Sequence, residues 1–276
     1  MSSNYRQLVE KCREIRYSVM DVIGQLGVGH VGGSLSVVEA MVVLYYKYMR
    51  IDPRDPQKVG RDRFVLSKGH AGPTLYAVLA DLGFFPRETL YTLNLGGTTL
   101  PSHPDMLRTP GVDMTTGSLG QGLSCAVGAA LASRYRGDGA RIFAIAGDGE
   151  CQEGQIWEAA MYAGHMKLDN LVAFVDFNNL QIDGRIDEVN GLEPLDRKWD
   201  SFGWNTVVVD GHSVEAIDRA VDNALQSRGR PSMIILKTIK GKGVSFIEEA
   251  GTGSHNMAIP PEKHARALQE LKAGGK

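Results

Sequence analysis

The sequence has few features of a secreted, membrane-bound or nucleic-acid-binding protein. Its three cysteines, Cys12, Cys125 and Cys151, show no CxxC spacing and cannot all pair, so no disulfide framework is expected. No apolar run approaches the roughly 18 residues of a membrane span, and residues 1–16 lack the apolar core of a signal peptide. Acidic and basic residues interleave to a net charge of −2, so neither nucleic acid nor membrane is expected as a partner. These absences predict a reduced, cytoplasmic protein.

The sequence does contain a regular alternation of helical segments and short aliphatic strands. Apolar spacing predicts a first helix over 5–26, and a capping-box pattern of Ser36 and Glu39 predicts a second from Ser36 to about Met49. Further helices are expected at 72–82, 120–136, 151–167 and 213–228, and strands at 63–67, 141–146, 170–177, 205–210 and 232–238. This alternation predicts an α/β fold, a mostly parallel sheet with helices on both faces.

A single domain is expected to cover 1–276, because no linker, internal repeat or low-complexity segment divides the chain. The Gly- and Pro-rich stretch 94–112 is interpreted as a loop within that domain. Only the final residues, 272–276, are expected to form a loose tail.

Polar and glycine residues gather where the predicted strands end. In parallel sheets, ligands bind beyond the carboxyl ends of the strands. The motifs at these ends are SKGH at 67–70, GDG at 147–149, NN at 178–179, DGH at 210–212 and KGKG at 240–243. We therefore expect the functional site at this edge of the sheet.

Asp148 and Asn178 are one βαβ crossover apart (178 − 148 = 30). If their strands are neighbours, about 4.8 Å apart, both side chains reach one point. One anionic and one neutral oxygen suit Mg²⁺, which keeps water or phosphate oxygens as its other ligands. Gly149 lets a backbone N–H approach a phosphate at a helix start. The pattern favours a metal–diphosphate site over the alternative, in which Asp148 merely caps a strand-to-helix turn and the two asparagines form a turn.

A second glycine pattern, Gly27-Val28-Gly29-His30-Val31-Gly32, spells the dinucleotide fingerprint GxGxxG. The fingerprint works only when it follows a strand and opens a helix. Here it follows a helix, so we favour a glycine-permissive turn that directs His30 into a cleft.

Together these motifs resemble the transketolase family. GDG followed by NN resembles the thiamin-diphosphate signature of that family. The other matches are GH at 29–30, DRFVLSKGH at 62–70, SHP at 102–104, TGSLGQG at 116–122, DGECQEG at 148–154, KTIKGKG at 237–243 and SH at 254–255. They occur in the family's order over nearly the whole chain. The resemblance implies the three-layer thiamin-diphosphate-binding fold.

The resemblance also implies how thiamin diphosphate and Mg²⁺ are bound. Asp148, Asn178 and the backbone carbonyl of Leu180 would hold the metal on the diphosphate. The residues that would contact the cofactor are His70, Lys68, Gly149, Lys240 and His255, with Gly117, Ser118 and Leu119 along the aminopyrimidine ring. The residues of TGSLGQG alone leave a tightly packed helix start equally open.

By the same resemblance, His30, His103 and His255 move protons on the sugar substrate and stabilise its alkoxide. Histidine suits this work because its pKa near 6.5 permits proton transfer in both directions near neutral pH. His165, His212 and His264 are interpreted as structural. Glu153 resembles the interface glutamate that couples paired active sites, and a carboxylate stabilised by a helix N-terminus remains an equal alternative.

Family members continue into a pyrimidine-binding domain that supplies the glutamate for cofactor activation. The sequence therefore predicts a diphosphate-binding subunit that transfers a two-carbon ketol unit between sugars or sugar phosphates. It would act with a C-terminal transketolase subunit, in an α2β2 heterotetramer. The alternatives are the α subunit of a thiamin-dependent 2-oxoacid dehydrogenase, which the SKGH, SHP and KTIKGKG motifs disfavour, and a non-catalytic scaffold or regulatory paralogue.

Overall fold

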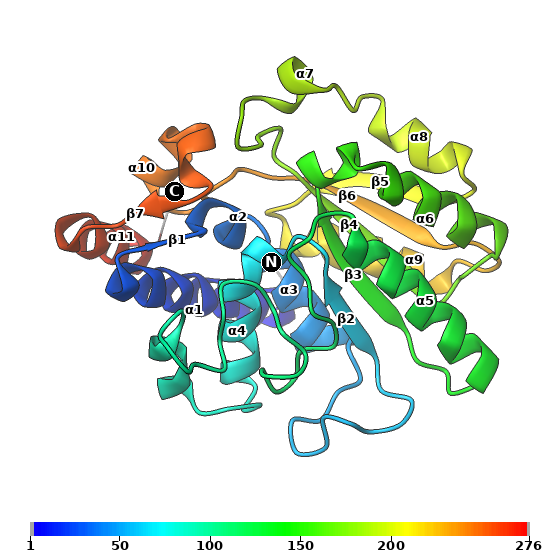
Figure 1. The fold of residues 1–276 in the computed structure, drawn as a ribbon, viewed down its shortest axis with the longest axis horizontal. Helices are drawn as coiled ribbons and strands as arrows, with labels where there is room; N and C mark the ends of the chain where they lie inside the picture. The colour runs from blue at the N-terminus through cyan, green and yellow to red at the C-terminus, as the bar shows by residue number, and fades with distance from the viewer. Residues whose placement is uncertain (1–2, 275–276) are drawn as a thin grey trace.

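In the computed structural model, which describes residues 3–274, five strands form one parallel sheet (Figure 1). In spatial order they are β2 (Arg63–Leu66), β3 (Ile142–Gly147), β4 (Leu171–Phe177), β6 (Ser232–Lys237) and β5 (Asn205–Asp210). Every neighbouring pair is parallel. All five expected strands are confirmed, each to within one residue at either end.

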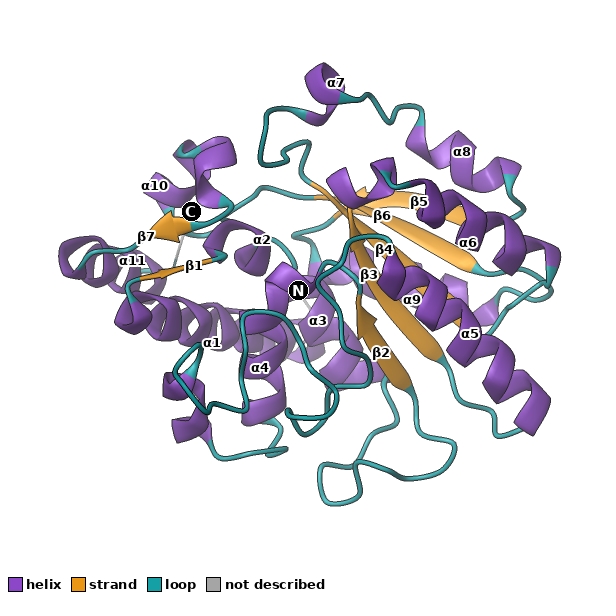
Figure 2. Cartoon of the chain, in the orientation of Figure 1, coloured by secondary structure: helices purple, strands orange, loops and turns teal. Residues whose placement is uncertain are grey.

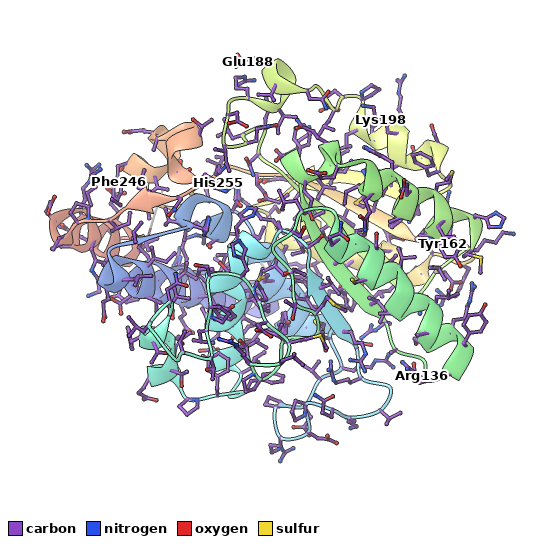
Figure 3. All side chains as sticks on the ribbon, in the orientation of Figure 1. Arg136, Tyr162, Glu188, Lys198, Phe246 and His255 are labelled. Atoms are coloured by element: carbon purple, nitrogen blue, oxygen red, sulfur yellow. The ribbon has the colours of Figure 1, made fainter. Side chains whose placement is uncertain are left out.

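Helices cover both faces of this sheet (Figure 2). Alternate residues of each strand point to opposite faces, so that Phe143 and Ile145 belong to one apolar cluster and Ile142 and Ala144 to the other. The first cluster is completed by α1 (Ser3–Leu26), α3 (Val38–Val43), α4 (Gly72–Asp81) and α9 (Val214–Gln226), and the second by α5 (Gln121–Arg136), α6 (Gly154–His165) and α8 (Leu195–Ser201). The three-layer α/β prediction is confirmed. Tyr162 projects outward from α6, and Arg136 lies at the end of α5 (Figure 3).

Smaller elements complete the chain. They are β1 (Val28–Gly29), α2 (Val31–Leu35), α7 (Ile186–Val189), α10 (Ser245–Glu249), β7 (Met257–Ala258), α11 (Pro261–Lys272), and short π- or 3₁₀-helical segments over Leu44–Tyr48 (η1), Gly69–Ala71 (η2), Arg87–Thr92 (η3), Gly149–Gln152 (η4) and Gly251–Ser254 (η5). Helix α11, which packs against α1, was not expected from the sequence. This helix includes Lys272, the first residue that was expected to belong to the loose tail. Residues 275 and 276 lie outside the described part. None of the helices within residues 3–274 is both long and apolar enough to cross a membrane.

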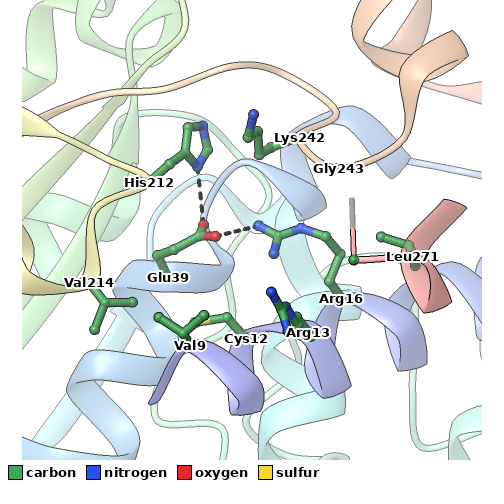
Figure 4. A pocket seen from close by; sticks show the side chains of 11 residues that line it. Val9, Cys12, Arg13, Arg16, Glu39, His212, Val214, Lys242, Gly243 and Leu271 are labelled. Atoms are coloured by element: carbon green, nitrogen blue, oxygen red, sulfur yellow. Dashed lines mark hydrogen bonds and ion pairs between the residues drawn. The ribbon is translucent and has the colours of Figure 1, made fainter. Parts of the chain in front are cut away.

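The predicted second helix is wrong at its start and in its continuity. Instead of one helix from Ser36, the chain forms α2, α3 and the π-helical turn η1. The Ser36 hydroxyl does not cap a helix, because it donates to Asp176 at 2.6 Å. Glu39 does not complete a capping box, because its carboxylate pairs with Arg16 (2.7 Å) and His212 (3.2 Å), as Figure 4 shows. Both side chains are recruited by partners distant in sequence.

His212, expected to be structural, links this buried network to the site segment that follows β6. Its Nε2 accepts a hydrogen bond from the backbone N–H of Ile239 at 2.8 Å. The imidazole proton therefore lies on Nδ1, which donates to Glu39. Burial opposes ionisation of Glu39, but Arg16 and His212 outweigh it and lower the pKa of that carboxyl. The network thus fixes the backbone next to Lys240.

Candidate functional site

Asp148 and Asn178 immediately follow the neighbouring strands β3 and β4, so their predicted proximity is confirmed. The Asp148 carboxylate accepts hydrogen bonds from the backbone N–H groups of Gly149 (2.8 Å), Asn178 (2.8 Å) and Asn179 (2.6 Å). The first bond caps η4, as the turn interpretation expected. The other two join the ends of two strands. Asp148 therefore acts as a cap and also fixes the turn that follows β4. The helix expected over 151–167 is accordingly preceded by η4, and α6 itself begins at Gly154.

The turn after β4 presents several oxygen atoms close together. The side-chain oxygen of Asn178 accepts from the backbone N–H of Leu180 at 3.1 Å. The Leu180 carbonyl accepts from the Lys240 ammonium group at 3.2 Å. Asn179 has a left-handed φ of 61°, which tightens the turn. A carboxylate, an amide oxygen and a backbone carbonyl thus lie at one place, and a positively charged group already contacts one of them.

Behind these oxygens lies a fully buried carboxylate that the sequence analysis missed. Asp176 accepts from the Lys68 ammonium at 2.5 Å and from the hydroxyls of Ser36 and Thr238. Burial opposes its ionisation, but Lys68 and these donors together lower the pKa of Asp176. Lys68, predicted to contact the cofactor, is therefore already paired while it also lines the cavity described below. The signal for Asp176 was a single acid in the otherwise apolar strand LVAFVDF.

Burial disfavours the charged forms of several ionisable groups in the site. Burial, with a contribution from Asp176, raises the pKa of Asp148 to about 6. Burial and the nearby Lys68 lower the pKa of Lys240 to about 8 and hold the pKa of His70 well below its usual value. A bound metal cation would favour the ionised carboxylate, and a bound anion would favour the charged lysine. The residues present therefore fit a metal cation that is itself bound to a phosphate group.

Four histidines from distant parts of the chain converge beside this site. The His30 ring lies 6.0 Å from His70, 5.4 Å from His103 and 5.5 Å from His255, measured between ring centroids, and the rings of His70 and His255 are 4.9 Å apart. Antiparallel pairing of β1 with β7 brings Gly29 opposite Met257, which places His30 near His255. The turn at 27–32 therefore brings His30 into the histidine cluster.

The surroundings of these histidines favour the neutral form of each imidazole ring. Burial, assisted by Lys240, lowers the pKa of His255 to about 4. Burial also lowers the pKa values of His30 and His103. The Lys240 ammonium lies 3.4 Å from Nδ1 of His255. Neutral imidazoles can accept a proton from a hydroxyl group and return it, which is the capacity needed for acid–base chemistry.

A cavity of about 220 Å³ lies between the Asp148, Asn178 and Leu180 segment and the rings of His70 and His255. Its walls include Gly33, Lys68, Asp148, Gly149, Lys240 and His255, and Leu119 and Glu153 stand at its rim. A Cβ atom at Gly33 would come within 3.0 Å of the His70 ring, so a side chain there would displace it. Gly117 has φ +135°, and a Cβ atom there would come within 3.0 Å of the His103 ring. The sequence analysis missed Gly33, whose role depends on its distance from His70 in space.

Comparison with known proteins identifies the family. The model for the transketolase thiamine diphosphate binding domain matches residues 7–271. The chain belongs to the transketolase family of enzymes. The resemblance inferred from the ordered motifs is therefore confirmed, and the domain is one that binds thiamin diphosphate.

The relatives include transketolase subunits of similar length. The chain is 54% identical over 275 residues to 6-deoxy-6-sulfo-D-fructose transketolase subunit SqwG from Clostridium sp. (strain MSTE9), with 100% of both chains covered. It is 38% identical over 256 residues to an apulose-4-phosphate transketolase subunit from Phocaeicola vulgatus, covering 93% of this chain and 90% of that one.

Solved transketolases are longer. The transketolase from Campylobacter jejuni superposes with a TM-score of 0.87 at 31% identity, over 96% of this chain and 43% of that chain. The chain thus corresponds to less than half of a solved transketolase and to essentially all of the similar subunit chains.

Proposed function

We propose that this chain is the diphosphate-binding subunit of a two-chain, Mg²⁺-dependent transketolase. The observation that carries the proposal is the cavity itself, which joins the oxygens of one strand-end turn to His70 and His255 of the four-histidine cluster. The similarity to transketolase subunits over the whole chain supports it. The family match is to transketolase, which disfavours the 2-oxoacid dehydrogenase alternative.

Within this proposal, Asp148, Asn178 and the Leu180 carbonyl hold Mg²⁺ on the diphosphate. Gly149 and the buried groups of His70 and Lys240 contact the cofactor, as does His255, while Lys68 supports the site through Asp176. Gly117, Ser118 and Leu119 line the aminopyrimidine ring from the opposite rim. When bound, thiamin diphosphate supplies the nucleophilic carbon and the electron sink needed to break the C2–C3 bond of a ketose.

The histidines of this chain handle the protons of that reaction. His103 and His30 lie on the side of the cluster away from Lys240, where sugar hydroxyl groups enter. His255 contacts Lys240 and spans the cofactor and substrate ends of the cavity. A neutral imidazole accepts the proton of the ketose C3 hydroxyl as the C2–C3 bond breaks, and it returns a proton when the new bond forms.

The donor that we propose is 6-deoxy-6-sulfo-D-fructose. The basis is the similarity to the subunit named for that sugar, 54% against 38% for the apulose-4-phosphate subunit. Loss of a two-carbon unit from this six-carbon ketose leaves a four-carbon sulfonated aldose. A negatively charged tail far from the reacting carbon would be bound mainly by the partner chain.

The function is tested with the chain purified together with its partner subunit, thiamin diphosphate and Mg²⁺. Release of the four-carbon sulfonated aldose in the presence of an aldose phosphate acceptor is the expected result, followed by mass spectrometry. Fructose 6-phosphate is the matched donor, because it differs in the terminal anion. Transfer from the phosphate sugar alone would refute the proposed donor, and no transfer from either would refute the transketolase assignment.

Two classes of histidine variant should separate substrate chemistry from cofactor binding. We expect His103→Ala to lower turnover by roughly 100-fold, the scale of lost general acid–base catalysis, with cofactor affinity nearly unchanged. His255→Ala should likewise lower turnover or weaken donor binding. His70→Ala should instead weaken cofactor binding, because His70 lines the cavity together with Asp148 and Lys240. Steady-state kinetics over a cofactor titration distinguish the two effects.

His264→Gln is the control for these variants. His264 pairs with Asp21 at 3.1 Å on the side of α1 and lies outside the histidine cluster. Its turnover and cofactor affinity should equal those of the parent. Unchanged kinetic constants in His103→Ala and His255→Ala would show that these histidines only fill space.

A further inference from the structure

Glu150 is a buried carboxylate to which the family resemblance assigns no role. Glu150 is 2% exposed. It directly follows the Gly-Asp-Gly turn and belongs to η4. It lines the wall of the cavity that holds Asp148 and Lys240. Because burying a carboxylate is costly unless it is hydrogen-bonded, its partners indicate what the protein gains from it.

Three donors surround this carboxylate, and each comes from a different segment of the site. Oε1 accepts from the Ser67 hydroxyl at 2.5 Å and from the backbone N–H of Gly120 at 2.9 Å. Oε2 accepts from the backbone N–H of Gly147 at 2.9 Å. Ser67 follows β2, Gly147 ends β3 and Gly120 precedes α5. One side chain therefore ties two strand ends to the start of a helix.

Each of these segments carries a neighbouring residue of the proposed cofactor site. Ser67 precedes Lys68, Gly147 precedes Asp148, and Gly120 follows the rim residue Leu119. Gly120 itself has a left-handed φ of 86° and α5 has no side-chain cap, so Glu150 supplies the only side-chain acceptor for that backbone N–H among the described residues. Without it, the end of the loop from Gly117 to Leu119 loses this hydrogen-bonded link to the strand ends.

We propose that Glu150 is a positioning residue that sets the distance between the diphosphate half and the aminopyrimidine half of the cofactor site. The proposal rests on the function proposed above. Glu150 acts through the segments bearing Asp148 and Leu119, because its oxygens already accept from protein donors. Its role is to keep those two segments in register while the cofactor binds across them.

The arrangement makes glutamine an unusually informative replacement. Glutamine has nearly the same shape, but one of its terminal groups is an NH₂ donor. In one orientation that NH₂ faces the N–H of Gly120, and in the other it faces the N–H of Gly147. In either orientation the NH₂ group and a backbone N–H, both of them donors, face each other, and that buried backbone N–H is left without an acceptor. Ser67→Ala, in contrast, removes one donor and leaves both backbone bonds intact.

The test uses the assembled two-chain enzyme and measures cofactor affinity, turnover at saturating cofactor and thermal unfolding. Glu150→Gln should weaken thiamin diphosphate binding by roughly tenfold or more, the scale of one buried unpaired group, and leave turnover at saturation within about threefold of the parent. Ser67→Ala should have a smaller effect on affinity. This split between affinity and turnover is what a positioning role predicts.

Asp113→Asn is the matched control for a purely structural carboxylate. Asp113 accepts from the backbone N–H of Phe64 at 2.8 Å and from Arg61 at 2.5 Å, at the amino end of β2, away from the site. It should lower the unfolding temperature and leave cofactor affinity unchanged. Parent-like affinity in Glu150→Gln, or an equal loss of affinity in Asp113→Asn, would overturn the proposal. Failure of the parent enzyme to bind the cofactor would instead refute the proposed function.

Discussion

Asp148→Ala should abolish the Mg²⁺-dependent part of thiamin diphosphate binding by the assembled enzyme. Asp148 is the only acidic ligand in the proposed metal set, and it is 3% exposed. Removing one partner of a buried charge pair costs about 3–5 kcal/mol, which corresponds to at least about a 100-fold loss of affinity. Isothermal titration with the cofactor at several Mg²⁺ concentrations measures the effect. In the parent, affinity should rise with Mg²⁺, and in the variant it should not respond.

The control removes a different carboxylate from the same cavity. Asp183 is an exposed residue at the cavity mouth and lies beyond the strand ends. Asp183→Ala should retain the Mg²⁺ response. Circular dichroism of Asp148→Ala is needed alongside, since the Asp148 carboxylate also accepts three backbone hydrogen bonds. A folded Asp148→Ala protein with parental affinity and parental Mg²⁺ dependence would contradict the metal assignment.

The sheet and the strand-end site could be predicted because their signals are local. Each strand is a short aliphatic run, and a run buried on both faces is typical of a parallel sheet. The crossover length between Asp148 and Asn178 then predicted neighbouring strands, which the register of β3 and β4 confirms. The polar residues at successive strand ends follow from the same geometry, because parallel strands end at one edge.

The errors concern residues whose partners are distant in sequence. Ser36 and Glu39 have the spacing of a capping box, yet Ser36 bonds to Asp176, 140 residues away, and Glu39 contacts His212, 173 residues away. Burial made those long-range partners more favourable than a local cap. Glu150 was passed over for the same reason, since its donors at Ser67 and Gly120 are 83 and 30 residues away. Local pattern gives the elements, and the side chains that connect them depend on the tertiary structure.

Exposed apolar side chains occur at the cavity rim and on α6. Leu119 at the cavity rim is 38% exposed, and on α6 Met161 and Tyr162 are 57% and 45% exposed. Helices α5 and α6 pack side by side over the sheet (Figure 1). Exposed apolar side chains of this kind are typical of a surface that a second protein covers. The exposed Glu153 lies at the same rim, which suits a glutamate that meets a second chain, although it also suits the helix N-terminus at Gly154.

The chain by itself should therefore have no ketol transferase activity, and a pyrimidine-binding subunit should restore it. The described residues form one five-stranded sheet and a two-stranded pairing of β1 with β7, so they contain no second α/β unit for the aminopyrimidine ring. A stable α2β2 assembly would bury about 2,000 Å² or more at each subunit interface.

We would purify the chain with and without the product of the neighbouring reading frame and measure ketol transfer and mass by light scattering. Met161→Glu should weaken association and Val59→Glu, in an exposed loop, should not. Full activity from the 276-residue chain alone would refute the two-chain assignment.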